Sequence, residues 1–121
     1  MILEEIGLTA ENRSIYSVVL TKDKNLENFD TLPIMLFTGL HHAREPLSFT
    51  MNLYLILKIM YDSIRGDPNI MEILNGSKFV FVPALNIDGY AEILEIYNRT
   101  MVLTEIIRKN RRKTDDCPKY D

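Results

Sequence analysis

Residues 39–46 read Gly-Leu-His-His-Ala-Arg-Glu-Pro, and the rest of the chain is arranged around them. The stretch joins an apolar run, Ile34–Phe37, to a long helical pattern that begins at Pro46. His42 and Glu45 are three residues apart, so both side chains can turn toward one point where the chain enters a helix. Imidazole nitrogen and carboxylate oxygen both bind zinc at about 2 Å. The stretch therefore predicts two ligands of a zinc site, although a lone His-x-x-Glu pair is a weak motif.

The composition excludes several classes of function. With 121 residues, 46% of them hydrophobic, the chain suits one globular domain with a core. The net charge of −3 provides no general attraction to nucleic acid or to an anionic membrane. The densest apolar stretch, Leu47–Tyr61, contains Asn52 and Lys58 and is shorter than the roughly 20 residues that span a bilayer. We therefore expect no membrane span and no nucleic-acid partner.

Three runs rich in β-branched and aromatic residues are expected to form strands. They are Ser14–Leu20, Leu32–Thr38 and Lys78–Pro83. A strand, a long helix and a second strand in that order form a crossover, which favours parallel pairing of the two strands. The sequence therefore predicts an α/β fold: a partial α/β/α sandwich with a mixed, partly parallel sheet.

The segments between and after these strands contain helix and loop signals. A long helix is expected from Pro46 to Arg65, with Gly66 as a left-handed cap, and its largely apolar composition predicts that it is deeply packed. Asp67 and Pro68 begin a shorter helix that ends near Gly76. Turns or loops are expected at residues 6–13, 23–31, 86–90 and 113–121, and weakly helical segments at 91–98 and 101–109.

Three motifs follow one another in order along the chain. Gly39–Glu45 follows a strand, Asn-Ile-Asp-Gly-Tyr at 86–90 follows the next sheet strand, and Arg-Lys-Asn-Arg-Arg occupies 108–112. Together with the opening Ile6–Ile15, they resemble the zinc metallocarboxypeptidases of the A/B type, peptidase family M14. The first half of that family reads Gly-Ile-His-x-Arg-Glu, Asn-Pro-Asp-Gly-Tyr and Arg-Lys-Asn-Arg. The resemblance implies that residues 1–121 are the amino-terminal portion of a carboxypeptidase catalytic domain, which is then incomplete.

The resemblance implies roles for four residues. His42 and Glu45 would be two zinc ligands, and Arg44 would contact the substrate beside the metal. Arg108 would be both catalytic and substrate-binding, because its cation would polarise the scissile carbonyl and stabilise the oxyanion. The implied activity is zinc-dependent hydrolysis of the C-terminal peptide bond, with the C-terminus of a peptide or protein as substrate and Zn²⁺ as cofactor.

The chain also departs from the family pattern. Pro46 and Ile107 stand where the family has tryptophan, and Ile87 stands where it has the proline of Asn-Pro-Asp-Gly. The family's third zinc ligand (a histidine), its Asn-Arg pair, the tyrosine over the substrate and the general-base glutamate are not among these 121 residues. A catalytic zinc site takes three protein ligands and an open position. We therefore expect the isolated chain to be inactive and to bind zinc weakly.

Ordinary structural roles compete with these assignments. Adjacent side chains of an extended segment point to opposite sides, so we assign His41 to packing or to a structural hydrogen bond rather than to the metal. Glu45 also suits the positive end of a helix dipole, a role that is compatible with zinc binding. Arg44 and Arg108 can be surface cations. Asn86, Asp88 and Gly89 are most simply a turn.

Two alternative functions remain open. The chain can be a truncated, catalytically inactive carboxypeptidase-like interaction module, which would have to hide its sheet edges from aggregation. The basic residues between Arg108 and Lys113 also allow a weaker interpretation as a nucleic-acid binder, against which stand the net acidity and the lack of interleaved aromatic residues.

The compartment is an expectation from three sequons and one cysteine. Asn12, Asn75 and Asn98 each begin an N-x-S/T sequon, which favours an extracellular, secretory or lysosomal compartment, although the first residues do not resemble a signal peptide. Cys117 is either a free surface thiol or half of a disulfide, and it stands where the family often has a disulfide cysteine. The oligomeric state cannot be predicted from these residues.

Overall fold

The computed structural model describes residues 1–22, 29–102 and 107–112. Its sheet contains four strands in the order β1-β2-β4-β3. They are β1 (Ile2–Leu8), β2 (Ser14–Leu20), β3 (Ile34–Thr38) and β4 (Lys78–Val82). The pairs β1–β2 and β2–β4 are antiparallel, whereas β3–β4 is parallel. The predicted mixed, partly parallel sheet is therefore confirmed.

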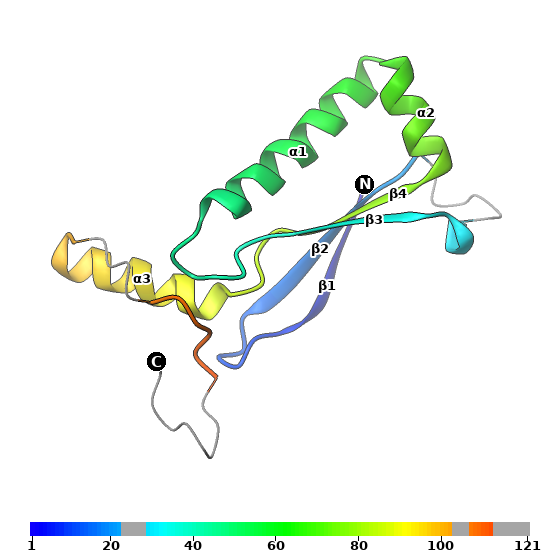
Figure 1. Cartoon of the computed structure of the whole chain (residues 1–121). Helices are drawn as coiled ribbons and strands as arrows, with labels where there is room; N and C mark the ends of the chain where they lie inside the picture. The colour runs from blue at the N-terminus through cyan, green and yellow to red at the C-terminus, as the bar shows by residue number, and fades with distance from the viewer. Residues whose placement is uncertain (23–28, 103–106, 113–121) are drawn as a thin grey trace.

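Helices lie between the strands of the sheet and after its last strand (Figure 1). They are η1 (Phe29–Thr31, a 3₁₀ turn), α1 (Leu47–Ile64), α2 (Pro68–Gly76) and α3 (Ile87–Thr100). The crossover from β3 to β4 runs through α1 and α2, as parallel pairing requires. The residues predicted to begin and end these two helices do so. Pro46 is the N-cap of α1, and Gly66, just after that helix, has a left-handed φ of 72°. The Asp67 carboxylate accepts hydrogen bonds from the first turn of α2.

The core lies between the sheet and the two crossover helices. Its buried residues are Leu20, Ile56, Ile59, Leu74, Phe79 and Phe81. The rings of Phe37 and Phe81, on the neighbouring parallel strands β3 and β4, stack with centroids 4.8 Å apart. This cluster packs α1 and α2 against β2 and β4. The polar residues of the 39–46 loop lie outside it.

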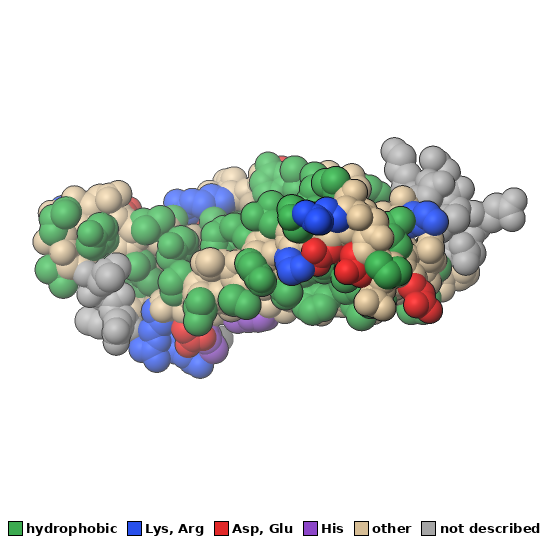
Figure 2. Space-filling model, turned by 90° about the horizontal axis from the view of Figure 1, so that it is seen from above, with side chains coloured by type: hydrophobic (Ala, Val, Ile, Leu, Met, Phe, Trp, Pro, Cys, Tyr) green, Lys and Arg blue, Asp and Glu red, His purple; other side chains and the backbone are tan. Residues whose placement is uncertain are grey.

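The prediction that α1 is deeply packed is wrong for the described structure. In this helix only Asn52, Ile56 and Ile59 are buried, whereas Leu57 and Ile64 are 66% and 83% exposed. Apolar composition alone could not show that a single face of α1 meets the sheet, while nothing in the described residues covers the other. Apolar side chains therefore spread over the surface seen in Figure 2. None of the described helices is long and apolar enough to cross a membrane.

The predicted turn at residues 6–13 begins too early. Residues 6–8 belong to β1, which pairs with β2 through an irregularity between Glu5 and Gly7, and the turn itself follows Leu8. β1 does not alternate between polar and apolar residues as a half-buried strand usually does, so the sequence did not predict it.

The predicted turn at 86–90 is also wrong, because these residues begin α3. The side chain of Asn86 accepts a hydrogen bond from the Gly89 N–H and caps the helix, so the turn signal was a helix start. The helical prediction for 91–98 is confirmed. Met101 ends α3 with a left-handed φ of 57°, and residues 107–112 are not helical, so the prediction for 101–109 fails wherever the chain is described. Residues 113–121, with Cys117, lie outside the described residues.

Candidate metal centre

The loop 39–46 is held tightly where β3 passes into α1. Leu40 is buried and adopts a φ of 51°, a left-handed conformation that is uncommon for a residue with a side chain. Its N–H donates to the Ser48 hydroxyl oxygen at 2.8 Å, and that hydroxyl donates to the carbonyl oxygen of Glu45 at 3.1 Å. Ser48 therefore ties the start of the loop to its end, and the surrounding hydrogen bonds maintain the strained turn.

His42 and Glu45 face each other at the start of α1. The Nδ1 atom of His42 lies 2.9 Å from Oε2 of Glu45, and the two side chains are 36% and 54% exposed. The hydrogen bond with His42 lowers the pKa of Glu45 below its ordinary value. The charges of Arg108 and Arg44 act in the same direction. An ionised carboxylate thus stands beside an imidazole nitrogen, open to solvent and close to two cations.

His41 takes a different direction from its neighbour. Its Nε2 atom lies 3.0 Å from the Thr38 hydroxyl oxygen, at the end of β3. This contact agrees with the assignment of His41 to a structural hydrogen bond. His42 alone of the two histidines contacts Glu45.

Arg108 is brought to this corner through its backbone. The Ala43 N–H donates to the Arg108 carbonyl oxygen at 3.0 Å, across a gap of more than sixty residues in the sequence. The structure thus gathers the four predicted residues, Arg44 and Arg108 with His42 and Glu45. Figure 2 shows the histidines (purple) next to acidic and basic side chains, below the apolar surface.

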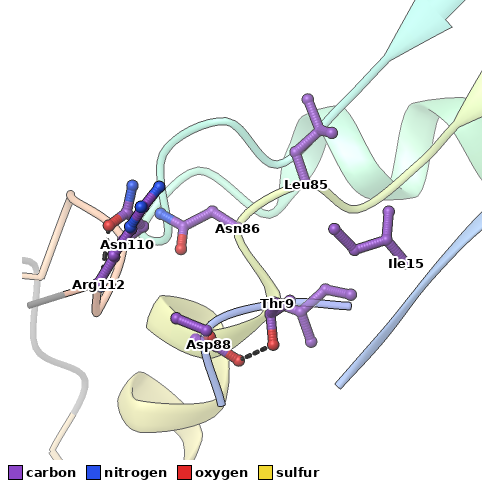
Figure 3. A pocket seen from close by; sticks show the side chains of 9 residues that line it. Thr9, Ile15, Leu85, Asn86, Asp88, Asn110 and Arg112 are labelled. Carbon is purple, nitrogen blue, oxygen red and sulfur yellow. Dashed lines mark hydrogen bonds between the residues drawn. The ribbon is translucent and has the colours of Figure 1, made fainter. Parts of the chain in front are cut away.

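A buried carboxylate, Asp88, connects the start of α3 to the turn after β1, and the sequence interpretation missed it. Asp88 has only 5% of its side chain exposed and accepts hydrogen bonds from the Thr9 hydroxyl at 2.7 Å, from Arg13 at 2.6 Å and from the Glu11 N–H at 3.1 Å. Burial raises the pKa of the Asp88 carboxyl, but the three hydrogen bonds outweigh it and hold that pKa below its ordinary value of 3.8. Figure 3 shows the hydrogen bond between Asp88 and Thr9. Both residues line a cavity of about 170 Å³.

Arg111 connects this network to the segment 107–112, which contains Arg108. Its guanidinium pairs with Glu92 on α3 at 2.5 Å and with Glu11 in the turn after β1. These hydrogen bonds, with Glu92 the stronger, raise the pKa of Arg111 above its ordinary value. One residue of the basic run therefore holds the segment 107–112 in place, which weakens the interpretation of that run as a nucleic-acid surface.

The donor set fits part of a zinc site. Two ligands of a tetrahedral zinc ion lie about 3.3 Å apart, so the 2.9 Å separation of the His42 and Glu45 atoms would have to widen by only about 0.4 Å. Within residues 1–22, 29–102 and 107–112, no three His, Cys, Asp or Glu side chains gather to hold a metal. Within the described residues, His42 and Glu45 therefore suit two positions of a zinc site, and no third ligand stands beside them.

Comparison with known proteins decides the family. The model of the M14 zinc carboxypeptidases matches residues 1–121. The chain belongs to the zinc carboxypeptidase family. An inactive metallocarboxypeptidase ecm14 of Schizosaccharomyces pombe is 30% identical over 93 residues, which are 73% of this chain and 18% of the relative. A protein of the same name from Sclerotinia sclerotiorum is 31% identical over 112 residues, 91% of this chain and 17% of the relative.

Solved structures agree on the fold. Thrombin activatable fibrinolysis inhibitor superposes with a TM-score of 0.70 at 20% identity, over 94% of this chain and 25% of that one. Carboxypeptidase A from Helicoverpa armigera superposes with a TM-score of 0.67 at 23% identity, over 94% and 24% of the two chains. This member of the zinc carboxypeptidase family thus has the fold of those proteins over its own length. It spans less than a fifth of the curated relatives described above.

Proposed function

We propose that His42 and Glu45 are two ligands of a zinc centre that hydrolyses the C-terminal peptide bond of peptides or proteins. The observation that carries this proposal is the 2.9 Å contact of an imidazole nitrogen and an ionised carboxylate at the start of α1. Residues 1–121 would be the amino-terminal portion of the catalytic domain. Membership of the zinc carboxypeptidase family supports both the metal and the reaction.

The two arginines have distinct roles in this proposal. When bound, zinc would supply Lewis-acid polarisation of a carbonyl group and activation of a water molecule. Arg108, held beside Ala43 by its own backbone, would place its cation where negative charge develops on the carbonyl oxygen. Arg44, which is exposed between the two ligands, would contact the substrate. His41 takes no part in the reaction.

Zinc titration of the 121-residue chain should separate the two histidines. We expect weak binding of Zn²⁺ at neutral pH, and a loss of affinity of at least about tenfold in His42→Ala, because removing even a group that supports a ligand has an effect of that size. Isothermal titration calorimetry of both proteins measures the change.

His41→Ala is the matched control for that experiment, since it removes an adjacent imidazole that contacts Thr38 rather than Glu45. Its zinc affinity should equal that of the unchanged chain. Equal losses in the two variants, or a loss in His41→Ala alone, would show that the ligand assignment is wrong.

The isolated chain should not hydrolyse a blocked dipeptide with a free C-terminus, even with zinc added. Two protein ligands are too few for a catalytic zinc site, and no general base has been assigned among these residues. The measurement is release of the C-terminal amino acid over the background without protein. Zinc-dependent turnover by the 121-residue chain, abolished by a chelator, would contradict this expectation.

A second candidate function is a catalytically inactive interaction module. Two observations favour it: the relatives described above are named inactive metallocarboxypeptidases, and β3 forms an edge of the described sheet with Leu36 63% exposed. An exposed apolar edge strand is a surface onto which another polypeptide can pair. This candidate predicts the same lack of hydrolysis but does not require zinc binding, so the calorimetric titration distinguishes the two proposals.

A further inference from the structure

Asn86 contacts the two segments that form the metal corner. We infer that Asn86 is a positioning residue: its side-chain amide clamps the backbone of Arg108 to the loop that carries His42. The importance of this clamp for catalysis rests on the proposed function, whereas the clamp itself can be tested without any metal. It differs from the sequence interpretation, in which Asn86 belonged to a simple turn.

The contacts of Asn86 use its whole side-chain amide. The Nδ2 group donates to the carbonyl oxygens of His41 at 3.3 Å and of Arg108 at 3.2 Å, while Oδ1 accepts from the Gly89 N–H at 3.2 Å. The residue is only 6% exposed, so these bonds are protected from water. The amide orientation follows from chemistry, because two carbonyl oxygens require donors and an N–H requires an acceptor.

The backbone around the side chain repeats the same connection. The Asn86 N–H donates to the Leu40 carbonyl oxygen at 2.8 Å, and the Ala43 N–H donates to the Arg108 carbonyl oxygen at 3.0 Å. The Arg108 carbonyl therefore accepts two hydrogen bonds, one from the loop and one from the start of α3. Figure 3 shows the Asn86 side chain extending from the start of α3 toward the segment of Asn110 and Arg112.

A simpler role for Asn86 would be the N-cap of α3 alone. Asn86→Asp separates the two roles, because aspartate caps a helix as well as asparagine does and its charge suits the helix N-terminus. The aspartate has no N–H to donate, and it would turn a carboxylate oxygen toward two carbonyl oxygens. The variant should therefore keep α3 and lose the clamp.

Amide hydrogen exchange of the 121-residue chain tests this inference. In Asn86→Asp, the Ala43 amide should exchange about tenfold faster, as expected when two buried hydrogen bonds beside it are lost. The Tyr90 amide, which donates to the Asn86 carbonyl oxygen within the first turn of α3, should keep its protection. Unchanged exchange at Ala43 would overturn the inference.

A matched control and a second variant complete the experiment. Asp67→Asn makes the reverse substitution at the cap of α2, far from Arg108 in the sequence, and should leave exchange at Ala43 unchanged. Asn86→Ser retains a capping oxygen but cannot reach both carbonyl groups, so it replaces Asn86→Asp if that variant fails to fold. If exchange at Ala43 rises but the unchanged chain binds no zinc, the clamp stands and the proposed function fails. If zinc binds and exchange is unaffected, only the clamp is wrong.

Discussion

Replacing Gly89 by alanine is expected to lower the free energy of unfolding by about 3 kcal/mol, the upper part of the range for overpacking a filled site. A Cβ at this position would lie 2.8 Å from the Ala43 Cβ, from the Asn86 Oδ1 and from the Lys109 carbonyl oxygen. Two of these three atoms belong to the loop 39–46 and to the segment 107–112. The added methyl group would therefore force apart the loop that carries His42 and Glu45 and the segment that contains Arg108.

Urea denaturation followed by circular dichroism measures this effect, and Gly76→Ala is its control. Gly76 ends α2, and a Cβ there meets nothing within 4 Å. That substitution should leave the free energy of unfolding unchanged or raise it by up to about 1 kcal/mol, because alanine restricts the unfolded chain. Equal stability of Gly89→Ala and the unchanged chain would mean that residues 43 and 109 are not packed against α3.

The second large effect is expected for Asp88→Asn, which should lower the free energy of unfolding by about 2 kcal/mol at neutral pH. The substitution keeps the shape of the side chain but leaves one oxygen for the hydrogen bonds that both carboxylate oxygens now accept. A buried N–H group would then face the Glu11 N–H or the Arg13 guanidinium. The Arg13 side chain is 40% exposed, so its guanidinium can hydrogen-bond to water when the carboxylate is removed. The loss of stability is therefore smaller than when a fully buried charge loses its partner.

The same carboxylate predicts a dependence of stability on pH. The pKa of Asp88 is lower in the folded chain than its ordinary value of 3.8, so its contribution is complete above that value and is lost as the pH falls toward the folded pKa. Asp88→Asn should therefore flatten the loss of stability below about pH 4. Lys58→Gln breaks the surface ion pair with Asp62 on α1. It should change neither the free energy of unfolding at neutral pH nor its decrease below about pH 4.

Local signals explain which elements could be predicted from the sequence. β2 and α2 were found at their observed ends, because a β-branched run defines one, and Asp67 with Pro68 defines the start of the other. β1 was missed because its pairing with β2 outweighs a poor alternation of polar and apolar residues. The start of α3 was missed because an asparagine followed by Asp-Gly serves equally well in a turn and as a helix cap.

The candidate site shows the same limit more sharply. His42 and Glu45 are three residues apart, and their meeting at a helix start could be expected from spacing alone. The clamp between Asn86 and Arg108 joins positions 22 residues apart, and the bond between Thr9 and Asp88 joins positions 79 apart. No periodicity encodes such contacts, since they depend on how the sheet and α3 are placed. The family motifs predicted which residues form the candidate site, but not the hydrogen bonds of Asn86 and Asp88.

The hydrogen bond between Glu11 and Arg111 spans 100 positions, and this has a consequence for the order in which the chain assembles. The crossover β3-α1-α2-β4 is built within one continuous stretch and contains both His42 and Glu45. Closing a loop of a hundred residues costs more conformational entropy than closing the shorter loops within the crossover. The stabilising contacts form only after both ends of the loop have met. We therefore expect the contact between His42 and Glu45 to form before Arg108 joins it.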